Sequence, residues 1–338
     1  MTWTLLSLES YGEHRAAWQA LNRRGPGSQL LEPLFWDPLI DHFSTGEEVL
    51  GIYGDPATPQ AMAILRRTGR FSWQTFQPAQ APIGAWLSED GAVLEELLTS
   101  LCRALPGLAG VLGVSQQDPD LLARPADGGR LRSADYIDTA RVTLAGDFAS
   151  YWAARGKNLR QNMSKQRNRL GRENIATRLE ILTAPEDMTR AVADYGALES
   201  AGWKGAAGTA VAMDNPQGPF YADLMRAFAV QGRAQVCRYF YNDRLTATDL
   251  CIDNGAEFII LKTTYDETEK KTSPAHLMRQ ELFEQLFDHS PIRIIEYYGR
   301  IRDWHTKWSD EFRTMFHVNY YRASLLARLH DLRRQTAK

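Results

Sequence analysis

The chain has 338 residues, of which 44% are hydrophobic and 24% are charged, a composition typical of a soluble globular protein. Because a domain usually contains about 100–150 residues, this length predicts two domains. The 39 Lys and Arg residues nearly balance the 41 Asp and Glu residues, and the net charge is -2. The net charge therefore gives no reason to expect that the protein as a whole is attracted to DNA or to an anionic membrane.

Targeting signals and metal-binding patterns are also missing from the sequence. The apolar runs are far shorter than the roughly 20 residues that a membrane-spanning helix needs. The N-terminus has no basic region typical of a signal peptide, and Glu9 and Glu13 come early. Cys102, Cys237 and Cys251 lie far apart, without metal-ligand spacing. We expect a cytoplasmic protein with no membrane span, no disulfide and no metal, and we expect buried, inert thiols at Cys237 and Cys251.

The first half of the chain alternates helical and strand-like patterns. Helices are predicted over 10–22, 30–43 and 90–103, and strands over 49–53, 61–67, 71–76 and 108–115. The polar segment 118–135 is rich in Gly, Pro and Asp, and it predicts a long connection to the second half.

The second half repeats that order of elements with stronger signals. Helices are predicted over 148–172, 185–198, 220–231 and 273–288, and strands over 234–241, 245–253, 257–265 and 292–298. Asn254-Gly255 is a strong hairpin signal between the second and third strands. An aromatic-to-basic stretch follows over 318–335. The repeated order suggests an internal structural duplication without a visible sequence repeat.

The start of the predicted helix 273–288 has the features of an anion-binding site. With Ser273 at the N-cap and Pro274 at the first helical position, several backbone N–H groups point outward at the positive end of the helix dipole. A pyrophosphate would fit there. The alternative is an ordinary, well-capped helix.

Three short motifs in the second half resemble one protein family. The first is LESAGWKG at 198–205, the second is KTTYDE followed by SPAHLM within 262–278, and the third is EYYG followed by KW within 296–308. In this order and spacing they resemble the CelD/BcsL-type acetyltransferase family of the GNAT superfamily, which is related to the FemABX aminoacyl transferases.

The resemblance implies an α+β fold with tandem GNAT-like domains, each a mixed, mainly antiparallel sheet flanked by helices. We expect a degenerate domain over 1–140 and the acyltransferase domain over 146–330. The implied reaction transfers an acyl group from acetyl-CoA or another acyl-CoA to an amine, such as an amino sugar of polysaccharide or envelope metabolism. The family's diverging strands correspond here to 257–265 and 292–298.

The resemblance also suggests which residues bind the donor. The diphosphate of CoA would lie on the helix start formed by Ser273, Pro274, Ala275, His276 and Leu277. The superfamily's usual Gln/Arg-x-x-Gly-x-Gly/Ala loop is missing from this sequence.

Catalysis on an amine requires removal of its proton and protonation of the leaving thiolate. Asp249 interrupts an apolar strand and is a candidate base, although an outward, solvated position is the alternative. Tyr265 and Tyr297 (or Tyr298) end the two diverging strands, where a phenol can protonate sulfur or simply pack.

Acceptor-binding residues are expected at the first and third motifs. Glu199 is a candidate to contact the amine beside Trp203 and Lys204; the alternative is a helix-end Glu beside a half-buried Trp. At the position where the family usually has a Lys, this chain has His305, and Lys307 follows two residues later. Either side chain can hold a phosphate or an oxyanion, or lie in a solvated loop.

Residues 155–172 carry seven cations and no acid, spread around the predicted helix. A solvated helix is one interpretation. The other is a phosphate contact, with Arg160 as the leading candidate, for CoA, a nucleotide- or lipid-linked sugar, or tRNA.

Two alternative functions stay open for the chain, a Fem-like transferase that uses aminoacyl-tRNA and a non-catalytic binding module of a biosynthetic complex. The sequence does not predict the oligomeric state.

Overall fold

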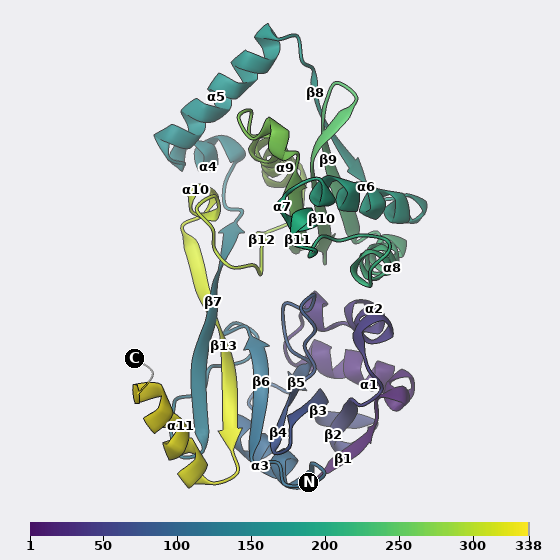
Figure 1. Cartoon of the computed structure of the whole chain (residues 1–338), viewed down its shortest axis with the longest axis vertical. Coiled ribbons are helices and arrows are strands. Elements are labelled where there is room, and N and C mark those ends of the chain that lie inside the picture. The colour runs from purple at the N-terminus through teal and green to yellow at the C-terminus, as the bar shows by residue number, and fades with distance from the viewer. Residues whose placement is uncertain (337–338) are drawn as a thin grey trace. The chain divides into compact units, whose positions relative to one another are not determined.

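A computed structural model describes residues 1–336 of the chain, which form two compact units (Figure 1). Unit 1 contains Met1–Asp138 and the segment that begins at Arg313, and unit 2 is Thr139–Phe312. Each unit is a mixed α+β structure with a largely antiparallel sheet flanked by helices, which confirms the predicted fold class.

In unit 1 the sheet has the strand order β1-β2-β3-β4-β6-β13, and β5 pairs with β3. All these pairs are antiparallel except β4 with β6. The strands are β1 (Trp3–Ser7), β2 (Val49–Asp55), β3 (Thr58–Gly69), β4 (Ser72–Thr75), β5 (Trp86–Ser88), β6 (Val111–Gln117) and β13 (Glu311–Tyr321). The helices are α1 (Tyr11–Arg24), α2 (Pro33–Phe43), α3 (Leu94–Ala104) and α11 (Ser324–Thr336).

In unit 2 the order is β12-β11-β10-β9-β8, with the end of β7 beside β12. Here too only one pair, β11 with β12, is parallel. The strands are the end of β7 (Leu131–Thr143), from Thr139 onward, and β8 (Thr177–Leu182), β9 (Ala234–Tyr241), β10 (Arg244–Asp253), β11 (Glu257–Tyr265) and β12 (Ile294–Glu296). The helices are α4 (Phe148–Ala154), α5 (Lys157–Arg172), α6 (Met188–Ser200), α7 (Trp203–Ala206), α8 (Gln217–Val230), α9 (Pro274–His289) and α10 (His305–Trp308).

The two units repeat one order of elements, which supports an internal duplication. In each, a strand and two longer helices precede three antiparallel strands, a helix, a parallel strand and a final strand. The final strands are exchanged between the halves of the chain, because β7 ends beside β12 while β13 pairs with β6. The residues of the two units therefore differ from the predicted domain ranges 1–140 and 146–330. Phe316, Val318 and Tyr320, near the C-terminus, are buried in the core of unit 1.

Two predicted elements are wrong. The helix predicted over 148–172 is two helices, because Arg155 and Gly156 lie in extended backbone between α4 and α5. The connection predicted over 118–135 ends early, since β7 begins at Leu131. No strand is predicted at β1 or β8. The side chains of β8 are mostly partly buried, those of β1 range from buried to exposed, and neither strand alternates clearly between buried and exposed positions.

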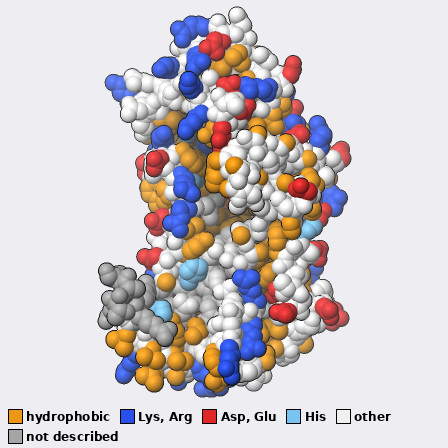
Figure 2. All heavy atoms as spheres, in the orientation of Figure 1, with side chains coloured by type: hydrophobic (Ala, Val, Ile, Leu, Met, Phe, Trp, Pro, Cys, Tyr) orange, Lys and Arg blue, Asp and Glu red, His pale blue; other side chains and the backbone are white. Residues whose placement is uncertain are grey.

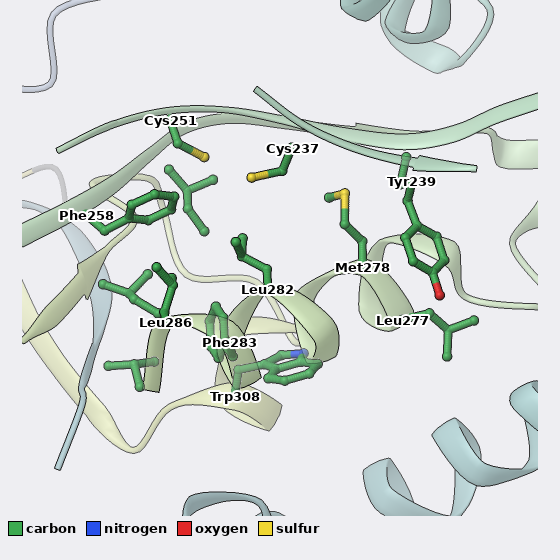
Figure 3. Packing of buried hydrophobic residues seen from close by; sticks show 14 of the residues in the cluster. Cys237, Tyr239, Cys251, Phe258, Leu277, Met278, Leu282, Phe283, Leu286 and Trp308 are labelled. Atoms are coloured by element: carbon green, nitrogen blue, oxygen red, sulfur yellow. The ribbon is translucent and has the colours of Figure 1, made fainter. Parts of the chain in front are cut away.

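The core of unit 2 forms where α9 packs on the sheet (Figure 3). Met278 and Leu282 face β9 and β10, where Cys237 and Cys251 are buried as free thiols, as predicted, while Leu277 points away from these strands within the same core. Burial of each large apolar side chain contributes about 1.5–3 kcal/mol to folding stability, so this layer fixes the position of α9.

Within residues 1–336, no helix has both the length and the apolarity needed to span a bilayer.

Candidate functional site

Strands β11 and β12 are paired only at one end. The parallel register joins Glu257 to Ile294 and ends where Ile259 meets Glu296. Beyond that point β11 continues to Tyr265 paired with β10 alone, while the Tyr297 N–H donates to the Ala140 carbonyl 3.3 Å away. The strands therefore diverge, and from residue 260 onward this edge of β11 has no strand partner among the described residues.

A β-bulge lies where the strands begin to separate. Cys251 of β10 pairs with Ile260 and Leu250 pairs with Lys262, so Leu261 is an extra residue in β11. A bulge bends its strand and redirects the side chains that follow. The bulge and the loss of pairing with β12 together shape the open edge of β11.

A cavity of about 370 Å³ lies at this open edge. Its walls come from the α6–α7 turn, the end of β11, the start of α9 and the loop before α10. The lining residues are Glu199, Gly202, Trp203, Lys204, Thr263, Thr264, Tyr265, Glu267, Lys270, Ser273, Pro274, Ala275, His276, Arg279 and Trp304.

The cavity brings together eight of the fourteen residues that the sequence predicts for the site: Glu199, Trp203, Lys204, Tyr265, Ser273, Pro274, Ala275 and His276. The other six do not line it: Asp249, Tyr297, His305, Lys307, Leu277 and Arg160. Sequence reasoning assigned no role to Arg279, Lys270, Thr263 or Thr264.

Glu199 is a buried carboxylate that lines the cavity. It forms an ion pair with Lys204, accepts a hydrogen bond from the Tyr195 hydroxyl at 2.9 Å, and accepts another from the Val211 N–H at 2.7 Å. Burial alone would raise the pKa of Glu199, but the Lys204 ammonium and the Val211 N–H outweigh it, and the pKa lies below its usual value. Glu199 is therefore ionised.

The tight turn before α7 returns Lys204 to Glu199. Glycine is required within α7 itself, because a Cβ on Gly205 would lie 1.9 Å from the Ser200 carbonyl oxygen. The Trp203 side chain is 64% exposed rather than half-buried, and the backbone N–H of Trp203 donates to Oε1 of Glu267 at 3.3 Å. The indole therefore forms part of the cavity rim.

The start of α9 also lines the cavity. Ser273 is the N-cap residue, but its side chain makes no capping hydrogen bond. The N–H groups of His276 and Leu277 donate to the Ser273 carbonyl oxygen, at 3.0 and 3.1 Å. In this first turn, Ala275 therefore supplies the one N–H without a partner among the described residues, fewer than the several that were predicted. Leu277 is buried in the core.

Ser273 has a backbone conformation that is unusual for a residue other than glycine. Its φ of 57° and ψ of 51° lie in the left-handed region that glycine favours. Counted from Lys270, Ser273 stands at the first glycine of the Gln/Arg-x-x-Gly-x-Gly/Ala pattern and Ala275 at the last position. Segment 270–275 therefore has the spacing of that pattern, although it lacks the pattern's Gln or Arg and its first glycine.

His276 lines the cavity as a neutral imidazole. Burial, with smaller contributions from Arg279 and Lys307, lowers the pKa of His276 to about 3. Its Nδ1 accepts a hydrogen bond from the Trp308 indole N–H at 2.8 Å. The ring therefore carries its proton on Nε2, and His276 contributes no positive charge to anion binding at neutral pH.

Arg279 lies beneath the cavity beside a buried acid. Its guanidinium is 4.3 Å from the Trp304 ring centre, and Nη2 is 3.5 Å from Oδ2 of Asp249. Asp249 is fully buried behind it, and burial raises the pKa of that carboxyl while the charge of Arg279 opposes the shift. A cation among the apolar residues of the α9 face is the sequence signal that would have identified Arg279.

Tyr297 and His305 support Trp304 from the core side. The His305 ring stacks on Trp304 with centres 3.6 Å apart, and its Nδ1 accepts the Arg302 N–H at 2.9 Å. Burial lowers the pKa of His305 to about 4. The Tyr297 ring meets Trp304 edge-on at 5.4 Å. Lys307 instead lines a separate cavity of about 380 Å³ beside α5.

The cations of α5 are not equally available. Acids pair with three of the seven cations, Arg155, Arg167 and Arg169, through Asp310, Glu281 and Glu173. Arg160, Lys165 and Arg172 line one groove of about 1060 Å³ beside Trp152 of α4, and Figure 2 shows cationic side chains over this helix. Three of the four remaining cations thus share one groove, which the sequence alone did not show, and the fourth, Lys157, does not line it.

In unit 1 the corresponding gap, between β4 and β6, is closed by the chain itself. The Ser115 N–H donates to Oγ1 of Thr75 at 2.9 Å, and the Gly84 N–H donates to the Gln116 carbonyl at 3.3 Å. A Cβ on Gly84 would lie 2.4 Å from the Ser115 carbonyl oxygen. Segment 76–85 thus occupies the place that is open in unit 2.

Comparison with known proteins supports a GNAT domain in unit 2. Residues 157–306 match the family described as acetyltransferase (GNAT) domain. This match covers less than half of the chain and does not test the narrower CelD/BcsL resemblance, which stays a prediction. None of the curated proteins matches the sequence.

Several solved structures share the fold over nearly the whole chain. The C-terminal domain of a putative lysylphosphatidylglycerol synthetase from Agrobacterium fabrum has a TM-score of 0.58 and 14% identity, covering 96% of this chain and 95% of its own. FemX has a TM-score of 0.58 and 10% identity, covering 97% and 99%. L-PGS from Bacillus licheniformis has a TM-score of 0.51 and 13% identity, covering 91% of each chain. At these identities the likeness concerns the fold alone.

Proposed function

We propose that unit 2 is an N-acyltransferase that moves an acyl group from acyl-CoA, such as acetyl-CoA, to a small amine or an amino sugar. The observation that carries the proposal is the end of β11–β12 pairing at Ile259, beside a cavity that reaches the start of α9. A free strand edge can pair with the amide-containing arm of the donor, and a helix start favours its diphosphate. The GNAT match over 157–306 supports the same reaction class.

In this proposal the lining residues have different tasks. The start of α9, with Ala275 and Lys270, holds the donor phosphates. Glu199, which is ionised, orients the acceptor ammonium in place of Lys204. The amine nitrogen attacks the thioester carbonyl, the C–N bond forms and the C–S bond breaks. The acceptor ammonium first releases one proton to solvent, which frees the lone pair for the attack. The second proton, which the nitrogen loses after the attack, balances the one that the thiolate gains.

Release of free thiol tests this function directly. The full chain is incubated with a panel of CoA esters and amines, and CoA is measured with a thiol reagent against reactions without amine. We expect saturable, amine-dependent release and a higher melting temperature with CoA thioesters, because ligand that binds the folded state stabilises it. No release with any pair and an unchanged melt at millimolar acetyl-CoA would favour a non-catalytic module.

Tyr265 is the proposed acid for the leaving thiolate. It lines the cavity, and burial raises the pKa of its phenol, which therefore keeps its proton at neutral pH. Because a positioned acid contributes about 10²–10⁴-fold, we expect Tyr265→Phe to lower kcat at least about tenfold, with little change in KM. Tyr136→Phe, on a partly exposed ring of unit 1, is the control. Equal kcat for the two variants would remove Tyr265 from the mechanism.

The groove beside α5 favours one second candidate, a transferase that uses aminoacyl-tRNA. Arg160, Lys165 and Arg172 line it without an acidic neighbour in its lining. Such a surface suits a phosphodiester backbone, whose binding weakens steeply with salt. Aminoacyl transfer from charged tRNA, lost on raising salt and on Arg160→Glu, would favour this candidate. Thiol release that is insensitive to that substitution would favour acyl-CoA.

A further inference from the structure

Helix α11 turns an apolar stripe away from its own unit. Leu325 and Leu329, one helical turn apart, are 65% and 47% exposed, and Leu326 beside them is also exposed. Ala327, on the opposite side of the helix, is fully buried. A surface helix normally buries its apolar stripe, so the stripe of α11 has the orientation expected of a binding surface.

Two further apolar side chains extend this surface. The N–H of Gly110 donates to the Phe71 carbonyl at 2.8 Å, and the N–H of Arg322 donates to the Gly110 carbonyl at 2.9 Å, which brings the β3–β4 turn to the start of α11. A Cβ on Gly110 would lie within 4 Å of both Phe71 and Leu326. Phe71 is 48% exposed, and Leu108, two residues before Gly110, is 58% exposed.

The charges around this surface are positive. The Arg70 guanidinium lies 5.1 Å from the Phe71 ring centre, and Arg328 is exposed on α11. The one acid of α11, Asp331, is already held by two hydrogen bonds from Arg132, at 2.8 and 2.7 Å. Exposed leucines next to arginines on a short helix are typical of helices that lie in the interfacial layer of a bilayer.

We propose that the surface formed by Leu325, Leu326, Leu329, Phe71 and Leu108 docks on an anionic phospholipid bilayer. The leucines enter the boundary between headgroups and acyl chains, and Arg70 and Arg328 contact lipid phosphates. A second copy of the chain suits the surface less well, because a two-fold contact would bring the same arginines together. This docking is independent of the proposed acyl transfer.

Vesicle flotation of the full chain tests the proposal. With vesicles of 30% phosphatidylglycerol in phosphatidylcholine we expect the protein to float, and with pure phosphatidylcholine we expect at least about fivefold less bound protein. Leu325→Glu/Leu329→Glu should reduce binding to anionic vesicles by about tenfold or more, because glutamate keeps the helix but not the apolar stripe. The matched control is Val230→Glu, an equally exposed apolar residue of α8.

Three results would overturn the proposal. They are no flotation with anionic vesicles, equal flotation of the double variant and the Val230→Glu control, and sedimentation of the wild type as a dimer that only the double variant dissociates. The last result would identify a second copy of the chain as the occupant of this surface. Arg328→Glu should weaken flotation with anionic vesicles alone, and an equal loss on both kinds of vesicle would contradict the role of charge.

Discussion

Ala275→Glu is expected to stabilise the protein while removing its affinity for acyl-CoA. Ala275 is in the first turn of α9, where a carboxylate interacts favourably with the helix dipole by about 0.3–1 kcal/mol. The same carboxylate would lie in the cavity where the donor phosphates are proposed to bind. Repulsion of about 2–3 kcal/mol between these like charges corresponds to a roughly 30- to 150-fold rise in KM for acyl-CoA.

The two halves of this prediction are measured separately. Thermal unfolding without ligand gives the stability, and thiol release over a range of acyl-CoA concentrations gives KM. Ala275→Gln fills the same space without the charge, so its KM should rise only a few-fold. A glutamate variant whose KM matches that of the glutamine variant would mean that the helix start is only a cap and that the donor anion binds elsewhere.

Much of unit 2 could be predicted from the sequence because its signals are local. Asn254-Gly255 fixes the β10–β11 hairpin, and Ser273-Pro274 marks where α9 begins. The exchange of β7 and β13 between units could not be predicted, since it depends on which buried faces meet in space. The break at Gly156 was hidden by a continuous helical pattern on both sides.

The candidate site was predicted in part for a similar reason. Motifs that lie on one turn, such as Glu199 with Trp203 and Lys204, reach the cavity together. Residues on strands were harder to place, because alternation assigns a side chain to a face without saying what covers that face. Asp249 points toward α9, where Arg279 covers it. These two residues are 30 positions apart in the sequence, so no local pattern indicates that they meet.

Arg279→Met is expected to cost about 3–5 kcal/mol of folding free energy, the typical effect of removing one partner from a buried ion pair. Both members of the Arg279–Asp249 pair are buried, and neither carboxylate oxygen of Asp249 accepts a hydrogen bond from the described residues. The substitution therefore leaves a charge with no nearby cation. By contrast, Arg226→Met removes the exposed pair with Asp223 and should change stability by less than about 1 kcal/mol.

The pH dependence of this loss identifies its cause. Burial raises the pKa of Asp249 in the folded protein, and removal of Arg279 should raise it further. A folded-state pKa above the unfolded value of about 3.9 means that stability falls as pH rises between the two values. Urea unfolding should therefore show a larger deficit for Arg279→Met at pH 8 than at pH 5. A deficit that is the same at both pH values would assign the loss to packing alone.

Removing both charges should restore most of the lost stability. In Arg279→Met/Asp249→Leu neither charge of this pair remains, and replacement of a buried ion pair by apolar residues of similar volume is often neutral or stabilising. We expect this double variant to unfold at a urea concentration near that of the wild type, with no difference in deficit between pH 5 and pH 8. If the double variant is instead as unstable as Arg279→Met, the contact of Arg279 with Trp304, at 4.3 Å, stabilises α9 more than the ion pair does.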